Sequence, residues 1–294
     1  MKYVLNLADI RLCLDSERLL RVEEEWEKFL IHSDSKYDIK VQVSWNWEHA
    51  LHPISQPLGN DTILEYYKEE NFCFCNTRAE KKGSLTSTSY HENMENMVCT
   101  INEKPYLNSP NSVGWIVRSL PMREILLHFN VLFFHAAQVS YQGTGILFSA
   151  PSGTGKTTQA RLWEKFKGAE VVCNDRTLVR KGMKGYKTYS YPLDGSEPIA
   201  STRVNRLGTI ILLEQGKRNE LKKISMGKKL SMLMEQLVMD CWNPDSRERN
   251  MLLLLEMIKE IPVYYFLCTP DAEAVDVLWN QLIKEGVIES GQNQ

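Results

Sequence analysis

The sequence lacks the features that mark membrane and secreted proteins. Its longest apolar runs, such as VLFF at 131–134 and MLLLLEMI at 251–258, are too short to span a bilayer. The first ten residues, MKYVLNLADI, lack the apolar core of a signal peptide and include an early aspartate. We therefore expect a cytoplasmic protein that has no membrane partner.

An excess of positive charge and paired metal-binding cysteines are also missing. With 35 Lys and Arg against 37 Asp and Glu, the formal net charge is -2, which argues against a nucleic-acid partner. The seven cysteines are scattered, and no pair of CxxC knuckles is present. This cysteine usage indicates reduced, mostly buried thiols.

The first part of the chain has the patterns of a β-rich mixed domain. Apolar residues recur at helical spacing over 18–30, which predicts a helix. Polar and apolar residues alternate over 40–48 and 71–77, which predicts strands. The turn-rich segment NEKPYLNSPNS at 102–112 marks a boundary. We therefore predict a first domain over residues 1–110, which would select the substrate.

The remainder, 111–294, alternates strand and helix patterns, which is typical of an α/β core. A helix should carry Ala160, Trp163 and Phe166 on one side, and the last helix should begin at a Thr269 cap. The other helices are expected at 113–129, 226–239, 247–259 and 271–285, and strands at 208–215 and 262–268. The predicted fold class is therefore α/β.

A phosphate-loop pattern lies in the middle of the chain. The apolar run GILFSA leads into APSGTGKT at 150–157, where Ala150 replaces the first glycine of the stricter pattern. Glycines let several backbone N–H groups point inward, and the following helix adds the positive end of its dipole. Lys156 can reach the outer phosphates, and the Thr157 hydroxyl can ligate Mg²⁺. The expected nucleotide-binding residues are Ser152, Gly153, Thr154, Gly155, Lys156, Thr157 and Thr158.

Two further residues have the spacing of a particular family. Asp175, at the end of a short buried strand, follows Lys156 by only 19 positions, and His135 precedes Ala150 by 15. This pattern resembles the HPr kinase/phosphorylase family, which is related in fold to the phosphoenolpyruvate carboxykinases. The HPr-kinase-like proteins found beside peptide-modification genes are more similar still, because they share the HAA–V strand and a P–xxGxE segment, here PLDGSEPI at 192–199.

The resemblance implies a phosphoenolpyruvate carboxykinase-like P-loop kinase core in the second domain. The implied activity uses ATP and Mg²⁺ and transfers the γ-phosphate to a hydroxyl of a peptide, a protein or a small alcohol. Thr157 and Asp175 would hold the metal. The implied catalytic residues are Asp175, His135, Glu197 and Arg203, with Arg176 and Arg206 as further candidates for contacting the phosphates. The related enzymes are often hexamers, so a homo-oligomer is compatible with the resemblance.

Departures from the family keep other functions open. Asn174 stands where the HPr enzymes have a second aspartate, and their ExRG signature is missing, which argues against HPr itself as the acceptor. An ATP-binding scaffold or regulatory module with a reduced active site is therefore the alternative. A plain ATPase or GTPase switch is disfavoured, because the chain has no guanine-reading NKxD motif.

Overall fold

The chain folds into two compact units, each built around a large mixed sheet. The computed structural model describes residues 1–60, 63–79, 83–104, 111–192 and 199–290. Unit 1 consists of residues 1–129 and 240–246, and unit 2 of residues 130–239 and 247–294. The predicted α/β class is confirmed. The predicted boundary at 110–111 falls at the edge of segment 105–110, which is outside the described residues, and it stays a prediction.

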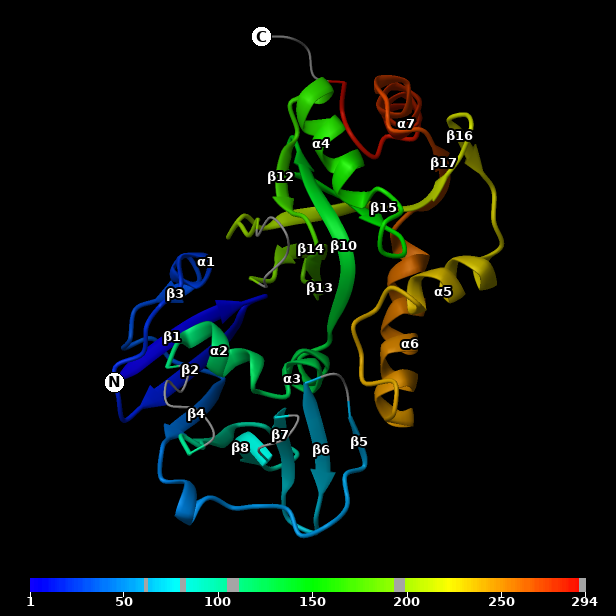
Figure 1. Ribbon diagram of the computed structural model, residues 1–294. Coiled ribbons are helices and arrows are strands. Elements are labelled where there is room, and N and C mark those ends of the chain that lie inside the picture. The colour runs from blue at the N-terminus through cyan, green and yellow to red at the C-terminus, as the bar shows by residue number, and fades with distance from the viewer. Residues whose placement is uncertain (61–62, 80–82, 105–110, 193–198, 291–294) are drawn as a thin grey trace. The chain divides into compact units, whose positions relative to one another are not determined.

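Unit 1 contains a nine-stranded sheet in the order β3-β1-β2-β4-β9-β8-β7-β6-β5. Its strands are β1 (Lys2–Leu7), β2 (Ile10–Ser16), β3 (Leu30–Ile31), β4 (Ile39–Ser44), β5 (Gly59–Asn60), β6 (Leu64–Lys68), β7 (Cys73–Ala79), β8 (Gly83–Tyr90) and β9 (Asn96–Ile101). They are drawn in blue and cyan in Figure 1. The strands predicted at 40–48 and 71–77 correspond to β4 and β7, although β4 ends at Ser44, before a short 3-10 turn at Trp47–His49.

The predicted helix over 18–30 is wrong except for one turn, α1 (Glu24–Glu27). Leu19 is 69% exposed, so the apolar spacing that predicted the helix does not describe a buried face. The Glu23 carboxylate instead accepts hydrogen bonds from Ser112 Oγ and from the backbone N–H of Gly114, 3.0 Å away. These bonds cap the N-terminus of another helix, α2 (Val113–Arg118). Long-range contacts therefore decided the conformation of this segment.

The helix predicted over 113–129 is two helices, α2 and α3 (Met122–His128). Pro121 lies between them as the residue that precedes α3, with ψ near 59°. Proline has no backbone N–H and restricts the residue before it, so a continuous helix breaks here. Both Ile125 and Leu126 of α3 are buried.

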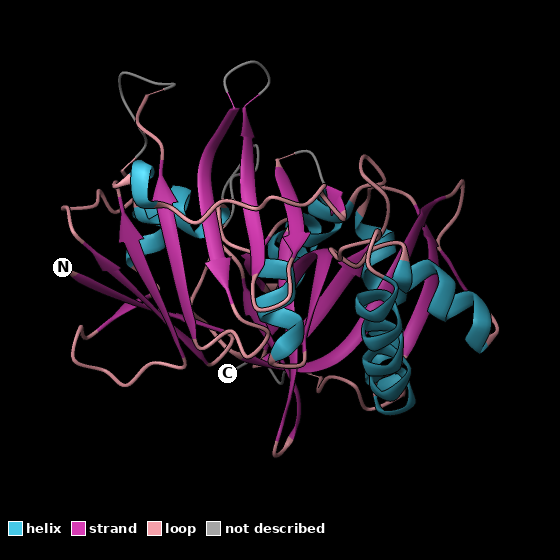
Figure 2. Cartoon of the chain, turned by 90° about the horizontal axis from the view of Figure 1, so that it is seen from below, coloured by secondary structure: helices cyan, strands magenta, loops and turns pink. Residues whose placement is uncertain are grey.

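Unit 2 contains an eight-stranded sheet in the order β11-β10-β13-β14-β15-β17-β16, with β12 paired to β10. Its strands are β10 (Val131–Tyr141), β11 (Thr144–Ser149), β12 (Glu170–Cys173), β13 (Arg176–Gly182), β14 (Gly185–Ser190), β15 (Asn205–Gln215), β16 (Glu220–Lys222) and β17 (Val263–Cys268). Parallel pairing joins β15 to β11 and to β17, and the other pairs are antiparallel. The strands of both sheets are coloured magenta in Figure 2.

Helices cover both faces of the sheet in unit 2. They are α4 (Lys156–Lys167), α5 (Met226–Met234), α6 (Pro244–Glu260) and α7 (Ala272–Lys284). Side chains of α4 and α7 share one core cluster with Phe148 of β11, whereas α5 and α6 share the other with Leu147. Since neighbouring residues of a strand point to opposite faces, the two helix pairs lie on opposite sides of the sheet, as Figure 1 shows.

The cap of α7 differs from the prediction by two residues. Asp271, rather than Thr269, is the N-cap, and its carboxylate accepts a hydrogen bond of 3.0 Å from the backbone N–H of Ala274. Thr269 donates its hydroxyl proton to the same carboxylate over 2.6 Å. Thr269 therefore supports the cap and does not form it.

The cysteines agree with the expected thiol chemistry. All seven are free, and five of them are buried. Across the described ranges of the chain, no helix combines the length and the apolar character needed to cross a membrane.

Trp163 anchors α4 to the sheet of unit 2. It is fully buried, with ring centroids 6.2 Å from those of Tyr141 and Phe148. Phe166, predicted on the same side of the helix, is 43% exposed. Ala160 and Phe166 are six residues apart, so their side chains point about 120° apart around the helix axis. Phe166 therefore lies off the face that Ala160 and Trp163 share.

We predict that Trp163→Ala lowers the free energy of unfolding of unit 2 by about 3–5 kcal/mol, because it opens a large cavity in a closed core. Phe166→Ala, on the same helix, is the matched control and should change it by less than about 1 kcal/mol. Urea denaturation followed by circular dichroism measures both. Equal losses in the two variants would contradict this description of α4.

Candidate functional site

The predicted phosphate loop connects β11 to α4. Gly153 and Gly155 have φ angles of 78° and 109°, in the left-handed region that favours glycine. A Cβ built on either residue meets no protein atom within 4 Å, so space is open beside the loop. Gly155 is the N-cap of α4, which has 12 residues, and the positive end of the helix dipole therefore lies at the loop.

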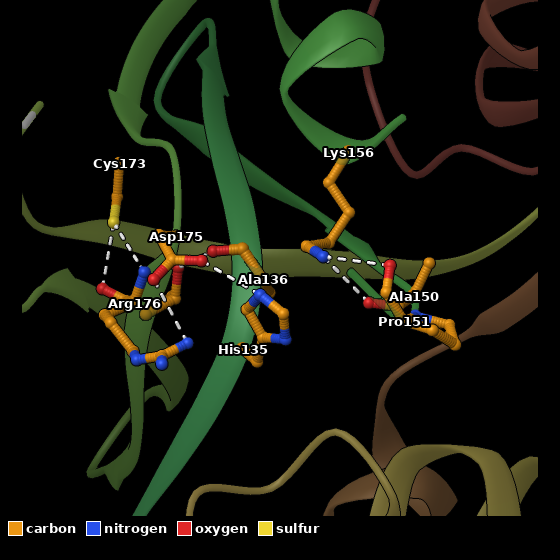
Figure 3. A network of polar contacts seen from close by, with 9 residues as sticks. His135, Ala136, Ala150, Pro151, Lys156, Cys173, Asp175 and Arg176 are labelled. Atoms are coloured by element: carbon orange, nitrogen blue, oxygen red, sulfur yellow. Dashed lines mark hydrogen bonds and ion pairs between the residues drawn. The ribbon is translucent and has the colours of Figure 1, made fainter. Parts of the chain in front are cut away.

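Lys156 lies beneath this loop and is only 6% exposed. Its Nζ donates hydrogen bonds to the carbonyl oxygens of Ala150 and Pro151 over 2.9 and 3.2 Å (Figure 3). Burial lowers the pKa of the ammonium group; the charge of Asp175 opposes this effect, and that of Arg176 adds to it. Lys156 is therefore a partly desolvated donor, and its hydrogen-bond partners among the described residues are neutral carbonyls.

The loop has one side-chain partner that the sequence did not reveal. Gln215, the last residue of β15, donates from Nε2 to the carbonyl oxygen of Gly153 over 3.2 Å. Because β15 runs parallel to β11, the ends of both strands lie at the same edge of the sheet. Of the predicted loop residues, Ser152, Thr157 and Thr158 are exposed and Thr154 is partly buried.

Asp175 lies between a histidine and an arginine. His135 Nε2 is 2.9 Å from Asp175 Oδ1, and Arg176 Nη1 is 3.1 Å from Asp175 Oδ2 (Figure 3). The backbone holds this arrangement, because the N–H of Ala136 donates to the carbonyl oxygen of Asp175 over 3.0 Å. In the same ladder, His135 of β10 is the register partner of Arg176 of β13.

The surrounding charges keep the Asp175 carboxyl ionised. Burial by itself would raise its pKa, but the hydrogen bond from His135 and the positive charges of Arg176, His135 and Lys156 outweigh burial and lower it. The pKa of Asp175 thus responds to Lys156, and that of Lys156 to Asp175. The loop and the His135–Asp175–Arg176 cluster therefore form one electrostatic site.

Cys173 fixes the turn that presents Asp175. Its buried thiol donates to the carbonyl oxygen of Arg176 over 2.9 Å, and its sulfur accepts from the N–H of Arg176 over 3.3 Å. These two hydrogen bonds join Cys173 to Arg176 across the turn between β12 and β13. They therefore hold the backbone before and after Asp175.

The remaining predicted residues are placed differently. Glu197 lies outside the described residues. Arg203 is exposed, and its Nε forms an ion pair of 3.1 Å with Glu170. Arg206 donates to Thr144 Oγ1 over 3.3 Å and to the carbonyl oxygen of Val287, beyond the end of α7, over 3.4 Å. Arg176 is therefore the guanidinium group that the structure puts beside Asp175.

The available donors suit a metal ion that keeps much of its water. Among the described residues, no group of three or more His, Cys, Asp or Glu side chains could hold a metal by itself. Mg²⁺ is commonly held by one or two protein oxygens together with phosphate oxygens and water. Asp175 and the Thr157 hydroxyl are oxygen donors of this kind, so the residues present fit Mg²⁺ accompanied by a phosphate ligand.

We predict that Asp175→Asn lowers the free energy of unfolding by on the order of 1 kcal/mol, since the two ion pairs are partly exposed. Because the pKa of Asp175 lies below 3.8 in the folded chain, this stabilisation is fully present above pH 3.8 and is lost as the pH falls through the folded value. Urea denaturation at pH 8, 5 and 3.5 tests this. A wild-type advantage that already changes between pH 8 and 5 would contradict the assignment of this stabilisation to the Asp175 carboxylate.

Comparison with known proteins places the chain in a family. No curated protein matches it in sequence. A solved structure, described as the Hpr(Ser) kinase/phosphatase from Coxiella burnetii, matches 52% of this chain and 93% of its own length, with 16% identity and a TM-score of 0.31. That likeness is weak and partial. The family model for the SynChlorMet cassette protein ScmC matches residues 98–278, well over half of the 294 residues. The chain belongs to the ScmC family.

Proposed function

We propose that the chain is an ATP- and Mg²⁺-dependent phosphotransferase that acts on a hydroxyl group of a peptide, a protein or a small alcohol. The observation that supports this most is the coupling of two features within one unit. A glycine loop with a buried lysine opens α4, and an ionised carboxylate paired with a histidine lies near enough to that lysine to perturb its pKa.

Binding of the phosphates would use the loop and Lys156. The loop N–H groups and the positive end of α4 attract negative charge, and the Lys156 ammonium would exchange its neutral carbonyl partners for phosphate oxygens. Burial makes this exchange favourable, because an ion pair is stronger where water is partly excluded. Gln215 would hold the loop in shape by its bond to Gly153.

Transfer would use the paired residues at Asp175. The acceptor oxygen forms a new bond to the γ-phosphorus, the bond from that phosphorus to the bridging oxygen breaks, and ADP leaves. The proton of the acceptor hydroxyl passes to the hydrogen-bonded His135–Asp175 pair. Mg²⁺ held by Thr157 and Asp175 would neutralise phosphate charge, and Arg176 orients the Asp175 carboxylate.

An ATP-binding scaffold without transfer is the competing proposal. It is favoured by Asn174, which supplies no second carboxylate beside Asp175. Both proposals require nucleotide binding, and they differ only in turnover. The decisive measurement therefore follows the phosphate itself.

We predict that the purified chain, mixed with Mg²⁺-ATP, forms a phosphomonoester visible by ³¹P NMR. The acceptors to test are serine, threonine, small alcohols and the peptides encoded beside the gene. Lys156→Ala should weaken ATP binding by about 10- to 100-fold, because a desolvated charge–phosphate contact is lost. Asp175→Asn should keep ATP binding within a few-fold and slow transfer by about 100-fold or more.

Lys165→Ala is the matched control for Lys156→Ala. Lys165 is an exposed lysine of the same helix, and its ammonium group lies over the ring of Phe166 rather than at the loop. ATP binding and phosphate transfer should both be unchanged in Lys165→Ala. Tight ATP binding without any phosphomonoester across the whole panel would favour the scaffold, and transfer that persists in Asp175→Asn would contradict the assigned role of Asp175.

A further inference from the structure

Unit 1 contains a cavity of about 440 Å³ that the proposed phosphotransfer does not use. Its lining combines aromatic rings with charged side chains, which come from β6, β8, α3 and the segment 240–246. The residues that matter below are Tyr66, Lys68, Tyr90, Glu124, Trp242 and Asp245. A cavity with aromatic walls and a few charged groups is the usual form of a site for a small ligand.

The aromatic wall is held in place from several sides. The ring of Trp242 lies 5.2 Å from that of Tyr66, centroid to centroid, at an interplanar angle of 35°. Gly59 lies against the same indole, where a Cβ would approach the ring to 2.2 Å, so only glycine fits there. Asp240 anchors the segment, because it is fully buried and pairs with Arg123 over 3.2 Å.

The indole N–H of Trp242 has no hydrogen-bond partner within the part of unit 1 that the structure describes, although the atom is buried. Such a donor is costly unless a ligand or water accepts from it. An ammonium group has no acceptor for this N–H, so the indole serves below as a reporter of the cavity and not as a contact of the charge.

Negative charge exceeds positive charge in this cavity. Lys68 is neutralised by Glu92, with Nζ 2.6 Å from Oε1. Neither Glu124 nor Asp245 forms an ion pair with any lysine or arginine among the described residues. Glu124 accepts a hydrogen bond of 2.7 Å from the Tyr90 hydroxyl. Within the described part of the chain, two carboxyl groups thus lack a paired lysine or arginine in a cavity whose wall includes the rings of Tyr66, Tyr90 and Trp242.

The protonation of Glu124 reflects this imbalance. Its pKa is raised to about 7, chiefly by burial and further by the charge of Asp240, against the opposing effects of the hydrogen bond from Tyr90 and the charge of Lys68. The thiol of Cys73 also lies within the electrostatic reach of Glu124. A cation beside Glu124 would favour the ionised form and would offset the cost of its burial.

We infer that this cavity of unit 1 binds a primary ammonium group carried on a hydrocarbon stem, with Glu124 and Asp245 facing the charge and Trp242 and Tyr66 packing on the stem. Carboxylates neutralise the cation, and aromatic faces attract it further. The side chain of a lysine in a peptide and a free alkylamine share this chemistry. The inference goes beyond the proposed phosphotransfer and does not depend on it.

The test is an NMR titration of the full chain with n-butylamine at pH 8, with n-butanol as the neutral probe of equal length. The reporter is the indole N–H signal of Trp242, assigned by its loss in Trp242→Phe. We expect saturable shifts with the amine and none with the alcohol. Glu124→Gln should weaken amine binding by about 10- to 100-fold, because a charged hydrogen-bond acceptor is removed. Glu95→Gln, an exposed carboxyl of the same unit, should bind as the wild type does.

A stability measurement separates binding from a purely structural role. Because the pKa of Glu124 is raised in the folded chain, its ionisation lowers stability as the pH rises from about 4.5 towards 7. Glu124→Gln should therefore raise the unfolding midpoint at pH 8 while it weakens binding. In the wild type, binding should weaken by about tenfold from pH 8 to pH 6, as Glu124 becomes protonated.

Three outcomes would overturn the inference: equal shifts with butanol and butylamine, unchanged amine binding in Glu124→Gln, or no saturable binding to the folded wild type. A capped lysine is compared with butylamine in the same titration, and binding of either supports the inference. If the capped lysine binds more tightly, the ligand is a lysine side chain of a peptide. If it binds more weakly, the ligand is a free amine. Lys156→Ala should bind butylamine normally, so loss of phosphotransfer leaves this test intact.

Discussion

The register of one strand holds the candidate site together. β10 runs antiparallel to β13, so that His135 lies opposite Arg176 and the N–H of Ala136 reaches the carbonyl oxygen of Asp175. The same strand pairs with β11, which ends at the phosphate loop. A slip of one residue would turn His135 to the other face of the sheet and separate it from Asp175. The chemistry therefore depends on the packing that pins β10.

Burial and charge act against each other in both units, with opposite results. At Asp175, the neighbouring cations outweigh burial, and the carboxyl stays ionised. At Glu124, no ion pair within the described part of the chain compensates for burial, and the pKa rises to about 7. The first carboxylate carries its charge without a ligand, as the proposed phosphotransfer requires. The second suits a site for a cation, because its charge is most stable when the ligand is present.

The agreement between sequence and fold follows the strength of local signals. Strands with strong apolar patterns, such as β15 and β17, form where the sequence predicts them, and α7 extends over most of its predicted range. The segment 18–30 has helical spacing but mostly leaves the helix, because Glu23 binds the start of α2, about 90 residues later. Local periodicity contains no information about a hydrogen bond to a distant part of the chain. Such bonds decided the conformation of segment 18–30.

The sequence by itself determined the glycine loop before α4, because its glycines, Lys156 and the helix that follows are adjacent in the chain and act through local backbone geometry. Spacing and family resemblance were enough to single out His135 and Asp175, but not to show that they touch. Only the tertiary structure decided that Arg176, rather than Arg203, accompanies Asp175. The cavity beside Glu124 also exists only in the tertiary structure, because its lining residues come from segments that lie far apart in the chain. Side-chain partners across a sheet depend on strand order and register, which long-range packing selects.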